Sequence, residues 1–459
     1  MTIANDIIVG VMPNFDLYLS EGESFDDIDE YGFTPLIECA IAGRLEIAEQ
    51  LLLRKIDVNK IDVVGRTALH WAVDNNNYEI AELLLRYHAD VNAYTTAGLS
   101  ILVFPVLREQ NELKSLLYRY GAKIDFAMDF INAKLLGHRF ELKGYVDIVN
   151  AKSEFIELNY EGFIIEFTVA VVANSLKRFT SSYSTKHLRE YFPYLHVIID
   201  AFQVASELLQ LQNYPILQNN HLERIKKLLQ SPLLILPAAS RGHALCFVRF
   251  NQWWGKIDRG ENSLKEGSVN LYRITNPSAI NVQFLCEFLY KKQPRKYFHQ
   301  IINQQLGLVH VAQLPIAGQI VGNCSWANVQ AVISVGYILQ NLIDSNKFHY
   351  DQALILYDAW VEWDKDRALD ECIQRFYLAD PIRKASFAAI LGAILFQSCH
   401  YDNNTHFMRV EKILQILLLP NYYYVLKSYI EIYCVQRLTR RGNNLLKLLD
   451  DFGIDPRKN

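Results

Sequence analysis

"VGRTALHWAVDNNNYEIAELLLRYHADVNA", residues 64–93, sets the architecture of the first quarter of the chain. A shift of 33 residues aligns this stretch with "YGFTPLIECAIAGRLEIAEQLLLRKIDVNK", residues 31–60. Each stretch opens on a turn glycine, continues with a threonine that can cap a short helix, and reaches a second helix with paired leucines. Self-similarity at this period predicts stacked two-helix repeats that bury the leucines between neighbouring units.

A third and less regular unit follows in the same register. The turn glycine recurs at Gly98 and the capping position at Ser100. Pro105, however, stands where the second unit has Ala72. Because proline disrupts the interior of a helix, we expect the first helix of this unit to be distorted or to begin late.

The period, the turn glycine, the T-P-L-H-like helix start and the Leu-Leu helix resemble ankyrin repeats. The resemblance implies an all-α solenoid over residues 1–125, with about three repeats and an N-terminal cap. It also implies that this region binds other proteins through the turn tips and the concave face and carries no catalytic activity. For any one contact candidate, solvent exposure or packing between repeats is the alternative. The contact candidates are Tyr31, Val63, Val64, Trp71, Tyr94 and Thr95.

Composition excludes several classes of partner. The 459 residues are 51% hydrophobic, enough to bury several cores, and 46 Lys and Arg against 50 Asp and Glu give a formal charge of -4. We therefore expect no direct nucleic-acid binding. The longest apolar runs are too short to span a membrane, and Asp6 stands where a classical signal peptide would be basic. The seven cysteines form no C-x-x-C pair, so we expect no disulfide framework, no metal and no cofactor.

The 33-residue register fails after Asp125. Residues 126–235 predict a mixed segment, with paired strands around a turn signal at Glu161–Gly162 and then helices, packed on the core that follows. We expect that core at residues 236–345 and a helical C-terminal region at residues 346–459.

A hairpin opens the predicted core. Residues 243–250 and 253–257 alternate as two β runs around a short turn. His243 stands at the head of the first run and Asp258 directly follows the second. In an antiparallel pair of this length the two side chains can meet at one edge, where a carboxylate orients an imidazole.

Further along, "VGNCSWANVQ" places Cys324 at the predicted opening turn of a helix, five residues after Gln319. A thiol ionises most readily at a helix N-terminus beside an imidazolium. The order His, Asp, Gln, Cys is similar to that of papain-like cysteine proteases in their permuted form. The resemblance implies an α+β protease-like core with His243 as general base and Asp258 as its orienting partner. It also implies that Gln319 and the Cys324 backbone N–H form an oxyanion hole.

Alternatives remain open at this site. An isolated cysteine is most often a buried structural residue. Asn270 or Glu261 could serve in place of Asp258. The arrangement could also persist in a pseudoenzyme that has lost activity.

As a whole, ankyrin repeats, a "GHAL…IDRG…GNCSWAN" module and a helical tail resemble ankyrin-repeat effectors that intracellular bacteria inject into host cells. The resemblance implies synthesis in the bacterial cytoplasm, secretion into the host cytosol or nucleus, and capture of a host protein by the repeats. It implies thiol-dependent hydrolysis of a peptide or isopeptide bond. The alternatives are a non-catalytic scaffold with a pseudo-protease domain and a thiol acyltransferase.

Overall fold

In a computed structural model the chain forms two compact units. Unit 1 comprises Met1–Ala133, Tyr145–Asn159 and Asp380–Ser386, and unit 2 comprises Lys134–Gly144, Tyr160–Ala379 and Phe387–Asn459. The structure describes residues 3–20, 22, 24–213, 219–240, 243–260, 267–319, 322–345, 348–437 and 439–455.

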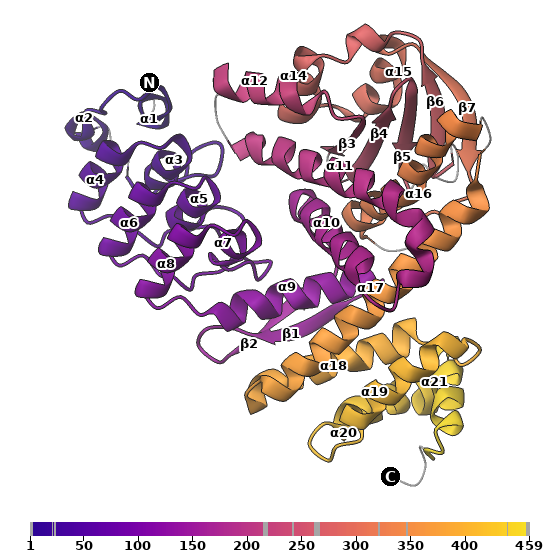
Figure 1. The fold of residues 1–459 in the computed structure, drawn as a ribbon. Coiled ribbons are helices and arrows are strands. Elements are labelled where there is room, and N and C mark those ends of the chain that lie inside the picture. The colour runs from indigo at the N-terminus through magenta and orange to yellow at the C-terminus, as the bar shows by residue number, and fades with distance from the viewer. Residues whose placement is uncertain are drawn as a thin grey trace. The chain divides into compact units, whose positions relative to one another are not determined.

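Unit 1 begins with stacked helices (Figure 1). Their bounds are α1 (Ile3–Val9), α2 (Phe15–Ser20), α3 (Pro35–Ala42), α4 (Leu45–Leu53), α5 (Ala68–Asp74), α6 (Tyr78–Arg86), α7 (Val103–Leu107) and α8 (Asn111–Arg119). The second helices α4, α6 and α8 each bury a leucine at the same repeat position, and Leu51, Leu84 and Leu117 are fully inaccessible to solvent. The predicted repeats are therefore present.

One side-chain oxygen closes the turn before each first helix. Asp62 Oδ1 accepts the backbone N–H groups of Val64 at 2.9 Å and Arg66 at 2.8 Å. Asp29 and Thr95 repeat this arrangement in the neighbouring turns. The glycines of the three turns have φ angles of 86°, 84° and 77°, which side-chain-bearing residues rarely adopt. This requirement accounts for glycine at the 33-residue spacing.

The third repeat departs from the pattern where the sequence predicts. Helix α7 begins at Val103, two residues after Ile101, where the period set by α3 and α5 would place its start. A helix that began at Ile101 would need a backbone N–H at Pro105, which proline lacks. Ser100 consequently caps nothing, and its buried Oγ has no hydrogen-bond partner within the described residues.

A helix and a hairpin follow the repeats. Helix α9 (Ile124–Arg139) contributes residues to both units, and β1 (Tyr145–Val149) pairs antiparallel with β2 (Phe155–Asn159). The predicted strands are present, but the chain reverses at 150–154, where Asn150 Oδ1 accepts two backbone N–H groups. The Glu161–Gly162 signal instead follows the second strand. An Asx turn therefore closes the hairpin, and the glycine does not.

Unit 2 contains a five-stranded antiparallel sheet in the order β3-β4-β5-β6-β7. The strands are β3 (Leu233–Ser240), β4 (His243–Phe250), β5 (Trp253–Ile257), β6 (Val269–Ile274) and β7 (Leu308–Leu314). The predicted hairpin is β4–β5. Strand β3 was not predicted because "SPLLILPAAS" contains two prolines, yet an edge strand accommodates Pro237 since only one side of it is paired.

Helices cover both faces of this sheet (Figure 1). On one face lie α11 and α16. Gly255 of β5 allows the close approach of Val335 on α16, and Gly336 of α16 allows that of Ile198 on α11. On the other face an aromatic core gathers Phe247, Trp254 and Phe298. The helices between residues 165 and 345 are α10 (Ile165–Ser181), η1 (Lys186–Tyr191), α11 (Phe192–Gln210), η2 (Leu211–Asn213), α12 (Asn219–Leu228), η3 (Pro277–Ala279), α14 (Val282–Tyr290), the π-helix η4 (Tyr297–Ile301), α15 (Ile302–Gln305) and α16 (Cys324–Ser345).

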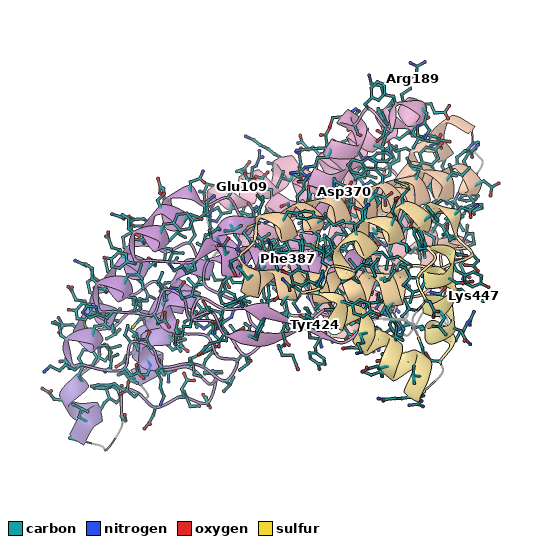
Figure 2. The ribbon with its side chains drawn as sticks, turned by 90° about the horizontal axis from the view of Figure 1, so that it is seen from below. Glu109, Arg189, Asp370, Phe387, Tyr424 and Lys447 are labelled. Carbon is teal, nitrogen blue, oxygen red and sulfur yellow. The ribbon has the colours of Figure 1, made fainter. Side chains whose placement is uncertain are left out.

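The C-terminal part is helical, as predicted. It consists of α17 (Tyr350–Leu378), α18 (Pro381–Ser398), η5 (Asn404–His406), α19 (Phe407–Leu417), α20 (Tyr423–Ile430), the π-helix η6 (Glu431–Gln436) and α21 (Arg440–Asp451). Figure 2 labels Asp370 on α17, Phe387 on α18, Tyr424 on α20 and Lys447 on α21.

A buried ion pair joins α17 to the part of α9 in unit 2. Asp364 accepts from Arg139 Nε at 2.5 Å and from Ser175 Oγ at 2.6 Å, and the Asp364 side chain is 2% exposed. Arg367 adds a second guanidinium at 2.7 Å. Paired charges of this kind are stable in a core only when every partner is present.

Among the described helices, none combines the length and apolar character that crossing a membrane requires.

Candidate functional site

Cys324 is the first residue of α16, and its thiol lies beside the start of β4. The backbone N–H of Ala244 points at Cys324 Sγ at 3.3 Å. Sequence positions 80 residues apart thus meet at the end of the sheet. The helix N-terminus and this N–H both favour negative charge on sulfur.

His243 and Asp258 lie together at the same place. His243 Nε2 hydrogen bonds to Asp258 Oδ1 at 2.8 Å, and Gly260 N–H donates to the same oxygen at 3.2 Å. The Asp258 side chain is 4% exposed and that of His243 is 25% exposed. Since Nε2 is engaged by the carboxylate, Nδ1 is the ring nitrogen left for Cys324. The structure therefore brings together three of the four side chains that the sequence singles out, namely His243, Asp258 and Cys324.

The charges of these groups reinforce one another. Hydrogen bonds first with Asp258 and then with Cys324 raise the pKa of His243 to about 9. Burial alone would raise the pKa of the Cys324 thiol, but hydrogen bonds from His243 and from the Ala244 and Ser325 backbone outweigh it, so this pKa is below its ordinary value. Burial alone would also raise the pKa of Asp258, but the hydrogen bond and the charge of His243 outweigh burial, so this pKa is below its ordinary value. At a pH between the pKa of Cys324 and that of His243, the favoured state is a thiolate beside an imidazolium.

A buried amide fixes the three chain segments that carry the site. Asn328, one turn into α16, accepts the N–H of Arg259 at 2.8 Å and donates to the Ala244 carbonyl at 2.7 Å. Asn328 is fully buried. Because Arg259 follows Asp258 and Ala244 follows His243, this one side chain locks the carboxylate and the imidazole to the helix that carries the thiol.

Gly260 leaves room for the imidazole. A Cβ atom at this position would lie 2.3 Å from His243 Cε1. The φ angle of Gly260 is not positive, so the histidine ring, rather than the backbone conformation, excludes a side chain here.

Gln319 lies on the segment that leads to α16. Its backbone N–H donates to the Arg259 carbonyl at 2.7 Å, next to Asp258 in the chain. Its side-chain Oε1 is buried and has no hydrogen-bond partner within the described part of the chain. The segment is therefore attached to the site by its backbone.

Two alternatives to Asp258 were open from the sequence. Asn270 lies on β6, where it donates to the Gly267 carbonyl at 3.3 Å and contacts His310 Nε2 at 3.2 Å. Glu261 lies outside the described residues. The carboxylate found beside His243 is Asp258.

The sequence reasoning missed two residues at this site. His299 Nε2 lies 3.7 Å from Asp258 Oδ2, and Lys256 Nζ contacts His299 Nδ1 at 2.8 Å. Lys256 and Asp258 are two positions apart, so alternation along β5 could have placed them on one face. No signal in the sequence places His299, on η4, beside them.

The proposed ankyrin contact residues divide into two groups. Tyr31, Val63 and Val64 are well exposed, and Tyr94 is 39% exposed. Two candidates are used internally. The indole N–H of Trp71 donates to Asp62 at 3.0 Å. Thr95 is 5% exposed and its hydroxyl accepts the turn N–H groups, so the repeat itself accounts for it.

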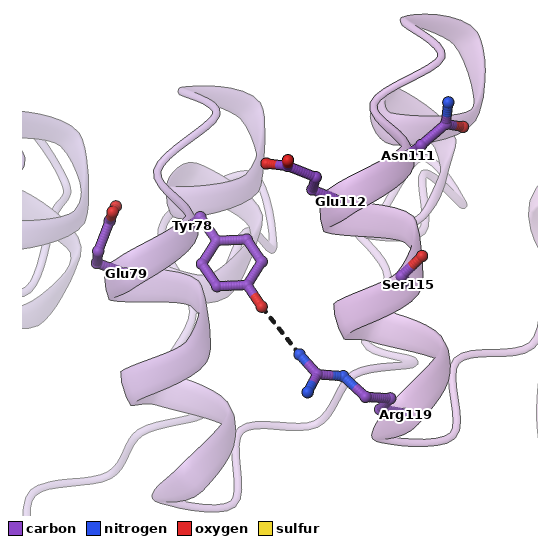
Figure 3. Close-up of a pocket in the computed structure, with 6 residues that line it drawn as sticks. All are labelled: Tyr78, Glu79, Asn111, Glu112, Ser115 and Arg119. Atoms are coloured by element: carbon purple, nitrogen blue, oxygen red, sulfur yellow. Dashed lines mark hydrogen bonds between the residues drawn. The ribbon is translucent and has the colours of Figure 1, made fainter.

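A groove of about 610 Å³ lies between α6 and α8 (Figure 3). Arg119 Nη2 donates to the Tyr78 hydroxyl across it at 2.9 Å. The remaining lining residues are Glu79, Asn111, Glu112 and Ser115. Glu79 and Glu112 stand at the same repeat position in the first helical turn, where they complement the helix dipole.

The seven cysteines are free thiols. Within the described ranges no group of three or more His, Cys, Asp or Glu side chains is arranged to hold a metal ion.

Comparison with known proteins gives two kinds of match. The ankyrin-repeat family matches residues 11–95 as three copies. Human inversin is 51% identical over 47 residues, which are 10% of this chain and 4% of inversin, and chicken inversin is 45% identical over 56 residues, 12% and 5% of the two chains. The chain thus spans only about one twentieth of the length of these inversins.

A solved structure matches along the whole chain. It is that of the Legionella effector AnkH, which is 68% identical, with a TM-score of 0.88 over 99% of this chain and 98% of that chain.

Proposed function

The chain belongs to the family of the Legionella effector AnkH, and from this we propose that it is secreted into a host cell and acts there on a host protein. In this proposal the chain is made in the bacterial cytoplasm and works in the host cytosol or nucleus. The ankyrin array, residues 1–125, captures the host protein. The region of residues 236–345 is a papain-like core that hydrolyses a peptide or isopeptide bond, flanked by the middle segment and the helical C-terminal region.

The observation that carries the catalytic part is the contact of Asp258, His243 and Cys324 at the first turn of α16. His243 takes the thiol proton, and the thiolate attacks the substrate carbonyl carbon. The Cys324 backbone N–H and the Gln319 side chain stabilise the oxyanion. His243 then protonates the leaving amine, and water hydrolyses the resulting thioester.

Two other functions fit parts of the same structure. Four exposed tip side chains and the ankyrin-repeat match over residues 11–95 support a binding or scaffold protein whose thiol site is inactive. A thiol acyltransferase would use the same three residues, with an acceptor amine in place of water attacking the thioester. Both alternatives retain the ankyrin array as the element that binds the host protein.

The pH dependence of alkylation tests the thiol site without a substrate. We expect iodoacetamide to modify Cys324 at pH 6 at least about tenfold faster than the other six thiols, because its pKa is lowered. His243→Ala should abolish this advantage at pH 6, and the two proteins should converge above about pH 9, where His243 becomes neutral. Mass spectrometry of the labelled peptides measures each rate.

Equal labelling of Cys324 and the six other thiols in the intact protein would reject the catalytic proposal and leave the scaffold. Rapid labelling without hydrolysis, but with transfer of an acyl group to an added amine, would identify the acyltransferase.

Capture from host lysate tests the array. Replacing Tyr31, Val63 and Tyr94 together by alanine should remove a host protein that the wild type recovers, while Cys324→Ala should retain it. Recovery of the same protein by the tip variant at wild-type level would remove these tips from recognition.

A further inference from the structure

Beyond the three residues described above, the thiol site has an outer pair formed by His299 and Lys256. We propose that His299, held by Lys256, is a positioning residue that fixes the Asp258 carboxylate in the orientation that serves His243. The inference rests on the proposed thiol site and adds a fourth and fifth member to it.

The two oxygens of Asp258 face different partners. Oδ1 is occupied by His243 at 2.8 Å and Gly260 at 3.2 Å. Oδ2 is turned toward His299 Nε2, at 3.7 Å. The side chains of Asp258 and His299 are 4% and 11% exposed, so water screens their interaction little. The carboxylate is thus bracketed by two imidazoles.

Lys256 decides which proton His299 carries. Its Nζ lies 2.8 Å from His299 Nδ1. An ammonium group only donates hydrogen bonds, so Nδ1 must accept, and the ring proton must reside on Nε2. Lys256 also opposes a second proton on the ring, because that proton would have to face the ammonium. His299 therefore presents a neutral Nε2–H toward Asp258 Oδ2.

The backbone holds the ring in this place. His299 lies in the π-helix η4, a rare element that often occurs at functional sites. Its neighbours Tyr297 and Phe298 are buried in the aromatic core that also contains Trp254 of β5. Trp254, Lys256 and Asp258 alternate along one chain segment and so share a face. The π-turn is consequently anchored on the face of β5 from which Lys256 and Asp258 project.

A carboxylate held on one side only can rotate about its Cβ–Cγ bond and release His243. With His299 in place, rotation would carry Oδ1 away from its two donors while moving Oδ2 out of the field of the Nε2–H. Loss of His299 should therefore weaken the hold of Asp258 on His243, and through it the stabilisation of the Cys324 thiolate. Asp258 is faced by His243 and His299, and His299 is faced by Asp258 and Lys256.

The test combines alkylation of Cys324 with NMR of ¹⁵N-histidine-labelled full-length chain. His299→Ala should slow alkylation by iodoacetamide at pH 6 by about threefold or more, because the buried carboxylate loses the nearby N–H dipole in a site that water screens little. His299→Gln, which retains an N–H donor, should slow it less. His310→Ala on β7, which removes another histidine in hydrogen-bond contact, should leave the rate unchanged.

The ring nitrogens give a readout that a merely structural role would not move. In the wild type, His299 should show the neutral Nε2–H form between pH 5 and 8, and Lys256→Met should abolish that preference. In His299→Ala the titration midpoint of His243 should fall. A His299 that is doubly protonated or carries its proton on Nδ1 in the wild type would overturn the proposal, as would an unchanged alkylation profile in His299→Ala.

Failure of the proposed function gives a different result. If Cys324 of the wild type is no more reactive than the other thiols, the hydrolase proposal fails. The tautomer of His299 and the titration of His243 then still decide whether His299 positions Asp258.

Discussion

The ankyrin array and the thiol site both depend on side-chain amides and carboxylates that bond to backbone, but over different distances along the chain. In the array, Asp62 bonds to groups two and four residues away, and Asn92 reaches 29 and 31 residues to the next repeat. In the thiol site, Asn328 bonds to groups 69 and 84 residues away, and Cys324 to one 80 residues away.

This difference determines how much stability each region loses when one side chain is replaced. A repeat contacts only its neighbours, so a lost bond in the array is confined to one interface. In unit 2 one side chain often joins three separate segments, so its loss releases all of them. Four tests of this contrast follow in order of decreasing expected effect, and the first two compare a pair of substitutions.

The largest effect is expected at the buried charge of α17. Asp364→Ala leaves Arg139 and Arg367 without their shared carboxylate, and removing one partner of a buried pair costs about 3–5 kcal/mol of stability. The matched control on the same helix is Asp370→Ala, whose exposed pair with Lys412 contributes less than about 1 kcal/mol. Urea unfolding measures both. Similar losses of stability in the two variants would show that the burial of an ion pair does not determine its contribution.

Asn328 and Asn92 form the second comparison, since each amide bridges two backbone groups. Asn328→Ala should cost roughly 2–3 kcal/mol of stability, because it leaves the buried Arg259 N–H and Ala244 carbonyl without a hydrogen-bond partner. It should also slow alkylation of Cys324 at pH 6. Asn92→Ala exposes its two partners to water and should cost less than about 1 kcal/mol. A larger loss for Asn92→Ala in thermal unfolding would reverse the contrast.

Pro105→Ala should stabilise the array by about 0.5–1 kcal/mol, the size of a helix-cap contribution. Alanine, which occupies this place in the second repeat as Ala72, supplies the missing N–H, so that α7 can begin at Ile101 with Ser100 as its cap. Circular dichroism and the thermal midpoint of the full chain measure the gain. An unchanged helix content and midpoint would mean that packing, rather than the proline, sets the start of α7.

The smallest effect is expected in the groove between α6 and α8. Arg119→Ala removes an exposed pair with Glu82, at 4.0 Å, and a bond to Tyr78, and should change stability by less than about 0.5 kcal/mol. A loss above 1 kcal/mol in urea unfolding would show that the groove contributes to holding neighbouring repeats together.

The same contrast explains what could be predicted from the sequence. The repeats were readable because each turn needs its own glycine and capping residue, and these recur at a fixed spacing. Even the late start of α7 followed from Pro105. Strands β6 and β7 were missed because their partners are set by sheet order, which a local pattern does not encode. At the site, His243, Asp258 and Cys324 were found by residue type and order, whereas His299 was not, since only the packing of η4 brings it to Asp258.

Gly260 offers a way to follow this site through the history of the family. The imidazole of His243 occupies the space that any side chain at position 260 would fill, while the backbone there is open to every residue. A relative with alanine or a larger residue at this position must hold the histidine ring in a different place or have lost it. Sequencing alone can therefore separate natural variants that have room for this arrangement from those in which the imidazole has moved or is gone, before any of them is purified.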